Sequence, residues 1–236
     1  MKQSNIKTPT LILIILMSAM NLFGQNTYNS LWKNVDQFNE GGQPREALKA
    51  TQGIFDKAVK EKNFPQMMKS WIRIIENKAD IDPDSFNIDQ FPKIDYKGPV
   101  QTALYNTIMG SAYENKYRSM NHAFDEETLE KGTAKAKEFY LKALEDKENL
   151  AAANAKEYEP MTETHEDGKI YNHDMLYVLT DFITDRSASL SDNEKISILA
   201  ETANFYKSKG NKDGWALLTI KLSQQLHSDL SLYQHP

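Results

Sequence analysis

The chain contains 236 residues, 40% of them hydrophobic and 26% charged, which is an ordinary composition for a globular protein of one or two domains. The net charge of −5 disfavours a nucleic-acid partner, because phosphate binding requires a basic face. Cysteine is absent, which excludes disulfides, thiolate nucleophiles, cysteine-ligated metal sites and the lipidated cysteine of a lipoprotein.

The first segment has the pattern of an export signal. Lys2 and Lys7 form a basic leader, and an apolar run follows at residues 11–23. This run is too short to span a bilayer as an anchor, and polar sequence follows it. We therefore predict a signal peptide over residues 1–24, cleaved after Gly24, with an uncleaved anchor as the alternative. The mature chain is expected to be periplasmic or secreted, with a net charge of −7 and no membrane span.

Residues 26–78 are expected to form a first group of helices, because apolar side chains recur there with a period near 3.6. The predicted helices cover residues 28–38, a stretch from Pro44 to a break at Lys62, and a stretch that opens at Pro65. The expected core positions are Leu31, Trp32, Val35, Phe38, Ala47, Leu48, Thr51, Ile54, Phe55, Ala58, Val59, Met68, Trp71, Ile72 and Ile75.

Residues 79–99 interrupt the helical pattern with three prolines and five aspartates, so they are predicted to form a loop seam between two helical groups. Asp80, Asp82 and Asp84 have the spacing that opens a calcium-binding loop. However, Ser85 stands where such a loop needs its turn glycine. We therefore interpret the seam as an acidic loop and predict no metal site.

A second group of helices is expected over residues 100–228, and we predict that it packs with the first group as one continuous domain. The predicted helices cover residues 100–120, a stretch capped by Asp125, 149–157, a stretch from about 172, 191–207 and 213–226. Ser191 and Glu194 have the spacing of a capping box. The expected core positions are Leu104, Ile108, Ala112, Tyr113, Ala136, Phe139, Tyr140, Ala143, Leu144, Met175, Leu176, Leu179, Phe182, Ile183, Ile196, Leu199, Ala200, Ala203, Tyr206, Trp215, Leu218, Leu222 and Leu226.

The fold class predicted from this pattern is all-α, and no stretch reads as a strand. Three helix pairs resemble one another, each with a large residue on its first helix and small residues on its second. Small residues such as Ala47, Ala136 and Ala143 are expected to let paired helices approach closely. These features predict antiparallel hairpins in a tetratricopeptide-like (TPR-like) α-solenoid, whose repeat is about 34 residues long. An unrelated helical bundle is the alternative.

The sequence contains no recognisable catalytic motif. Its five histidines form no His-Glu-x-x-His pair, and no phosphate-binding loop, dinucleotide-binding glycine pattern or Gly-x-Ser-x-Gly turn is present. We therefore predict a non-enzyme without catalytic, cofactor-binding or metal-binding residues. One cluster remains as a functional or structural candidate, namely Tyr171, Asn172, His173 and Asp174, where Asn172 or Asp174 is placed to cap a helix.

Four segments resemble the helical N-terminal region of large exported bacterial alpha-2-macroglobulin-like proteins. They are residues 28–35 (YNSLWKNV), 42–48 (GQPREAL), 60–69 (KEKNFPQMMK) and 171–178 (YNHDMLYV), in the same order. The resemblance extends over nearly all of residues 28–228. It implies a helical module that precedes β-sandwich domains. The family's thioester needs a cysteine, so the absence of cysteine implies that this chain cannot trap a protease covalently.

Together these observations predict an exported, non-enzymatic protein–protein interaction or scaffold module of the cell envelope. The chain is expected to be a stand-alone version or a truncated form of the helical region. The expected partner is an envelope protein, with macroglobulin-like β-domains as one candidate. The alternative is a glycan- or nutrient-binding accessory protein, which predicts aromatic side chains exposed in a groove. A third alternative, a hydrolase, needs a pocket where carboxylates or His173 converge.

Overall fold

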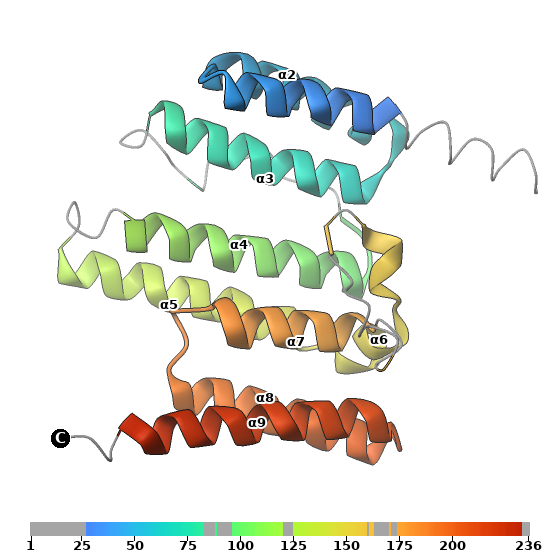
Figure 1. Ribbon diagram of the computed structural model, residues 1–236, viewed down its shortest axis with the longest axis vertical. Coiled ribbons are helices and arrows are strands. Elements are labelled where there is room, and N and C mark those ends of the chain that lie inside the picture. The colour runs from blue at the N-terminus through green and yellow to red at the C-terminus, as the bar shows by residue number, and fades with distance from the viewer. Residues whose placement is uncertain are drawn as a thin grey trace, which may run out of the picture. The chain divides into compact units, whose positions relative to one another are not determined.

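The computed structural model describes residues 27–82, 88, 96–119, 125–159, 161–162, 170 and 174–232, and these residues are helical with short connections and no strand (Figure 1). The all-α prediction is therefore confirmed for this part of the chain. Residues 1–24, the predicted signal peptide, lie outside the described residues. The chain divides into two compact units, Met1–Phe86 and Asn87–Pro236.

The described residues of unit 1 form three helices, which cover residues 27–40, α2 (Pro44–Glu61) and α3 (Phe64–Ile81). Gly42 lies in the left-handed region at φ 64°, which lets the chain turn into α2. Lys62 adopts the same conformation at φ 54° and ends α2. The Asn63 side chain then accepts a hydrogen bond from the Gln66 amide and caps α3.

Two aromatic anchors fix helix 27–40 to the rest of unit 1. Tyr28, 1% exposed, donates its hydroxyl hydrogen to Glu61 over 2.8 Å. Trp32 donates its indole N–H to Gln66 over 2.7 Å, although the two lie 34 residues apart in sequence. Ala47 and Ala58 of α2 are fully buried, so that face of the helix lies in the core.

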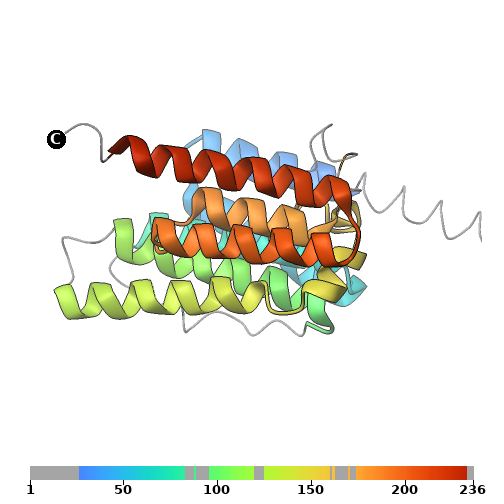
Figure 2. The ribbon, with the colours of Figure 1, turned by 90° about the horizontal axis from the view of Figure 1, so that it is seen from below.

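In unit 2, the helices of the described ranges form three pairs. The first pair is α4 (Pro99–Ser119) with α5 (Glu126–Ala143), and the second is α6 (Lys147–Ala152) with α7 (Met175–Arg186). A 3₁₀ turn, η3 (Ala155–Tyr158), lies between α6 and α7. The last pair is α8 (Asp192–Ser208) with α9 (Lys212–Leu232), which lie side by side in Figures 1 and 2.

Local capping explains where the helices of unit 2 begin. The Asp125 side chain accepts from the Thr128 amide and starts α5, as predicted. Ser191 and Glu194 form the predicted capping box at the start of α8. These two predictions are confirmed, because a cap depends only on residues within one helical turn.

Glycines opposite tyrosines set the spacing within two of the helix pairs. A Cβ placed on Gly110 of α4 would lie 2.7 Å from the ring of Tyr140 in α5. A Cβ on Gly214 of α9 would lie 3.1 Å from the ring of Tyr206 in α8. A glycine costs about 1 kcal/mol relative to alanine inside a helix, and here it makes room for a tyrosine on the paired helix.

Several predicted bounds require correction. The helix predicted over residues 149–157 is two elements, α6 and η3, because Asn154 leaves the helix and forms an isolated bridge with Asp174. The helix predicted from about residue 172 begins at Met175. The last helix extends to Leu232 rather than to Leu226.

Several predicted core positions are also wrong, because periodicity identifies an apolar face without showing that another element covers it. Val59, Phe182, Trp215 and Leu226 are 38–46% exposed. Ten more are only half-buried, namely Leu31, Phe38, Leu48, Ile72, Ile108, Tyr113, Phe139, Ile196, Ala200 and Leu222. Within the described ranges, no helix has the length and apolar character needed to cross a membrane.

Candidate functional site

The candidate cluster of residues 171–174 is described only at Asp174, while Tyr171, Asn172 and His173 lie outside the described residues. Asp174 is 5% exposed and caps α7, since its side chain accepts from the Tyr177 amide over 2.8 Å. The same oxygen, Oδ1, accepts from the Tyr206 hydroxyl over 2.5 Å. Asp174 therefore joins the start of α7 to α8.

Burial dominates the electrostatics of this pair. It raises the pKa of Asp174 to about 6, although hydrogen bonds from Tyr206 and from backbone amides oppose the shift. Burial also raises the pKa of Tyr206, and the Asp174 charge adds to that effect. Tyr206 is 1% exposed, so neither oxygen of the pair is presented to a substrate. The described geometry is that of a structural latch.

Asp174→Asn is expected to stabilise the chain near neutral pH by about 1–2 kcal/mol, because asparagine keeps an acceptor for Tyr206 and Tyr177 while removing a buried charge. The folded state binds the Asp174 proton more tightly than the unfolded chain does. The stability that this proton contributes is complete below about pH 4 and is lost as the pH rises through about 6. The advantage of the variant should therefore appear between these two pH values in urea titrations.

Asp125→Asn is the matched control, because Asp125 is also an aspartate N-cap but is exposed. The hydrogen bond from the Thr128 backbone lowers the pKa of Asp125, so its charged form is the favoured one. Relative to wild type at the same pH, Asp125→Asn should gain no stability as the pH rises. An Asp174→Asn effect that does not change with pH would contradict the latch interpretation.

A second buried carboxylate, Glu114 of α4, was missed by the sequence analysis. It is 8% exposed and accepts hydrogen bonds from three donors in the α7–α8 connection. These are the Ser187 hydroxyl at 2.9 Å, the Ala188 amide at 2.7 Å and the Ser189 amide at 3.2 Å. Glu114 follows Gly110 by one helical turn on the face that packs against α5. A charged residue on a helix face that otherwise packs against another helix was the signal in the sequence that could have identified Glu114 as a buried carboxylate.

An open cavity of about 430 Å³ lies between α5 and the start of α8. Its lining residues are Glu126, Leu129, Glu130, Thr133, Ala134, Lys137, Ser189 and Glu194. Lys137 forms an ion pair with Glu194 and lowers the pKa of that carboxyl, which keeps Glu194 ionised rather than available as a proton donor. Among the described residues, no group of three histidine, cysteine or acidic side chains could hold a metal ion.

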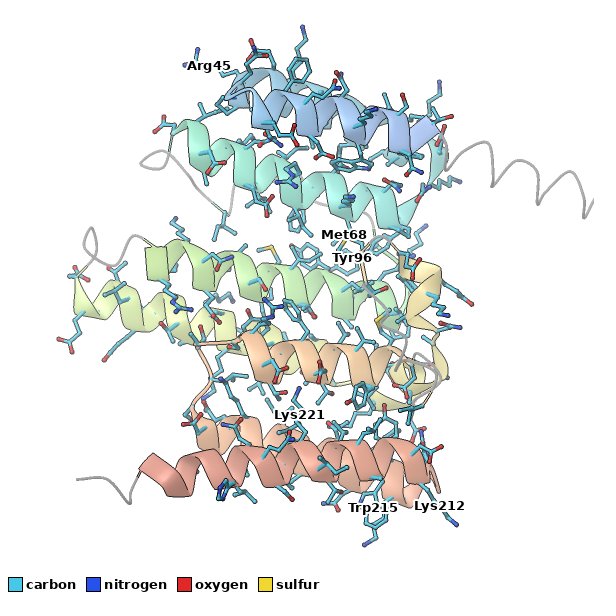
Figure 3. All side chains as sticks on the ribbon, viewed as in Figure 1. Arg45, Met68, Tyr96, Lys212, Trp215 and Lys221 are labelled. Carbon is cyan, nitrogen blue, oxygen red and sulfur yellow. The ribbon has the colours of Figure 1, made fainter. Side chains whose placement is uncertain are left out.

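The outer face of α9 is the most unusual surface of unit 2. We use this name for its exposed positions between Asp213 and His227, which are Trp215, Ala216, Thr219, Ile220, Ser223, Gln224 and Leu226. None of them is charged. Trp215, Ile220 and Leu226 are 38%, 57% and 43% exposed. In Figure 3, Trp215 and Lys212 point away from α7.

The single charged residue between Gly214 and Leu226 faces the other way. Lys221 binds Asp181 and Asp185 of α7, and Figure 3 shows it pointing toward that helix. By contrast, the exposed positions of α2 include six charged residues, namely Arg45, Glu46, Lys49, Asp56, Lys60 and Glu61. A helix face that carries no charge over three turns and exposes three large apolar side chains is typical of an interaction surface. Trp215 and Leu226 were predicted to lie in the core, and both are exposed.

No protein-family model matches this chain, and no curated protein or solved structure is significantly similar to it. The family resemblance expected from the sequence therefore finds no support in these comparisons.

Proposed function

We propose that this chain is a non-enzymatic, exported protein-interaction or scaffold module of the cell envelope. On this proposal it is built from TPR-like helical hairpins and related to the helical region of alpha-2-macroglobulin-like proteins. The observation that carries the proposal is the outer face of α9, which exposes Trp215, Ile220 and Leu226 and has no charged side chain among its own positions. Tryptophan is enriched among the few residues that supply most of the binding energy at protein interfaces, and Trp215 is the one exposed tryptophan of the described residues.

Hydrogen bonds between helices support the repeat architecture. Trp32 and Gln66 are 34 residues apart, and Asp174 and Tyr206 are 32 residues apart. Each bond thus joins positions separated by about one TPR-like repeat. Solenoids of such hairpins commonly present surfaces that bind peptides or other proteins.

The test uses the tagged full chain expressed in its native host. After fractionation, the chain should be found in the periplasm or medium. Its measured mass should be that of a mature chain that begins at Gln25. Capture from the envelope fraction, with an untagged copy of the chain present, should recover a stoichiometric protein partner. Leu226→Glu should lose this partner because it places a charge in the apolar face.

Val59→Glu is the matched control, since Val59 is an exposed apolar residue of α2 with an exposure of 46%, close to the 43% of Leu226. This variant should retain the partner. Recovery of the chain in the cytoplasm would overturn the proposed location. Equal capture by wild type and Leu226→Glu would overturn the assignment of the outer face of α9 as the binding surface.

A glycan-binding accessory role is the second candidate, and the exposure of Trp215 favours it. Trp32 and Trp71 are buried, whereas Trp215 presents part of its ring to solvent. The Lys207 ammonium lies 5.4 Å from the centre of that ring, so the ring has a cation near one face. Glycan-array binding that Trp215→Ala abolishes and Leu226→Glu retains would favour this candidate over a protein partner.

A further inference from the structure

We propose that one side of α9, the stripe formed by Trp215, Thr219, Leu222 and Leu226, pairs two copies of this chain in an antiparallel, two-fold symmetric contact. This inference rests on the proposed interaction function and names the occupant of the same surface. Three features of the hairpin formed by α8 and α9 carry it: a mostly apolar stripe with a symmetric spacing, the absence of charge on that stripe, and opposite charges at its two ends.

The stripe consists of Trp215, Thr219, Leu222 and Leu226, which follow one another at intervals of four, three and four residues. Residues with this spacing lie along one side of a helix. The order of intervals is the same when read from either end. In an antiparallel contact centred between Ile220 and Lys221, Trp215 therefore meets Leu226 of the partner subunit, and Thr219 meets Leu222 of the partner subunit.

The first helix of the hairpin extends the apolar surface next to this stripe. Lys207 of α8 lies over the Trp215 ring, so the side of α8 that carries Lys207 faces the stripe. Ile196 and Ala200 precede Lys207 by three turns and two turns on that same side, and both are only half-buried. The surface available to a second copy thus includes apolar groups from both helices.

The absence of charge is decisive for a symmetric contact. A two-fold axis brings each patch against its own copy, so any charge near the axis meets a like charge. The exposed positions between Asp213 and His227 carry no charge, and Lys221 is held by Asp181 and Asp185 of α7. This surface can therefore meet its own copy without like-charge repulsion, whereas the charged outer positions of α2 cannot.

Charges at the ends of the hairpin favour the antiparallel direction. Lys207 and Lys212 lie near Trp215, at the connection between α8 and α9. Asp192 lies at the opposite end, where it accepts a hydrogen bond from Gln225 over 3.1 Å. An antiparallel contact places the basic end of one copy beside the acidic end of the other, and it also opposes the two helix dipoles.

The size of the surface predicts a weak association. The stripe runs from Trp215 to Leu226, which is about 16 Å along a helix. A contact of this length is smaller than the standard interface of a stable complex, so the expected dissociation constant is roughly micromolar. The dimer should therefore form reversibly as the protein concentration rises.

Sedimentation velocity of the purified chain, from low micromolar to several hundred micromolar, tests the proposal. Wild type should shift from monomer to dimer within this range, and Leu226→Glu should remain monomeric throughout. Ile220→Glu is the matched control, because Ile220 is exposed on the same helix but about 130° around it from the stripe. This control should dimerise like wild type.

A second measurement does not depend on a destabilising charge. The natural chain has no cysteine, so Thr219→Cys introduces a single thiol within the stripe. A short thiol-specific crosslinker should convert this variant to a covalent dimer, whereas Lys49→Cys, an exposed position in unit 1, should not crosslink. Wild type that stays monomeric at all concentrations, or equal crosslinking of both cysteine variants, would overturn the dimer. If the dimer is overturned in this way but a different protein is still captured through Leu226, the proposed interaction function stands and only the dimer is wrong.

Discussion

Gly110→Ala should lower the free energy of unfolding of unit 2 by about 2 kcal/mol, even though alanine is the better helix former. The new Cβ would lie 2.7 Å from Cδ1 and Cε1 of Tyr140. This ring has nowhere to move, because Tyr140 is 2% exposed and its hydroxyl lies 3.1 Å from Ser111 Oγ. The overlap must therefore separate α4 from α5, and this cost exceeds the gain in helix propensity.

Gly53→Ala is the matched control, because Gly53 is also inside a helix but is exposed, and its Cβ position has no atom within 4 Å apart from its chain neighbours and the backbone of its own helix. This variant should gain about 0.5–1 kcal/mol. Urea unfolding followed by circular dichroism measures both effects, with the transitions of the two compact units fitted separately. If Gly110→Ala and wild type have equal stability, the ring of Tyr140 does not pack closely against Gly110 in solution.

Gly132→Ala extends the comparison to a ring that has room to move. Its Cβ would lie 2.2 Å from the ring of Tyr117, a closer approach than at Gly110. Tyr117 is only half-buried, however, so its ring has solvent into which it can turn. We therefore expect a smaller loss than for Gly110→Ala despite the shorter distance. The order of the two losses tests whether burial of the neighbour, rather than distance alone, sets the cost.

Features that depend on one helical turn were predictable from sequence. The Asp125 cap and the Ser191–Glu194 capping box are confirmed because donor and acceptor lie three residues apart. Of the two caps predicted for the helix from about residue 172, Asn172 or Asp174, the structure shows Asp174 at the start of α7. Its burial and its bond to Tyr206 were not predictable, because that partner lies 32 residues away on another helix.

The outer face of α9 shows the limit of periodicity as evidence. Trp215, Leu218 and Leu226 all belong to the apolar pattern, but only Leu218 is buried. The pattern identifies apolar positions without stating which neighbouring helix covers them. The run with Lys221 as its sole charge was visible in the sequence, but an uncharged run is equally typical of a buried helix.

Glu114→Ala should destabilise unit 2 by about 3 kcal/mol, because it removes the common acceptor of three donors. The Ser187 hydroxyl and the Ala188 and Ser189 amides all end on this carboxylate, so the α7–α8 connection loses its attachment to α4. Only part of the lost bonding is replaced by water, since Ser187 is 2% exposed. Hydrogen exchange should show faster exchange of the Ala188 and Ser189 amides.

Glu130→Ala on α5 provides the control, since Glu130 is an exposed glutamate and its removal should change stability by less than about 0.5 kcal/mol. Ser187→Ala removes one of the three donors and should cost about 1 kcal/mol. Because Glu114 and Ser187 bond each other, the double variant should lose less than the sum of the single losses. Additive losses, or unchanged exchange at Ala188 in Glu114→Ala, would mean that Glu114 does not hold this connection in solution.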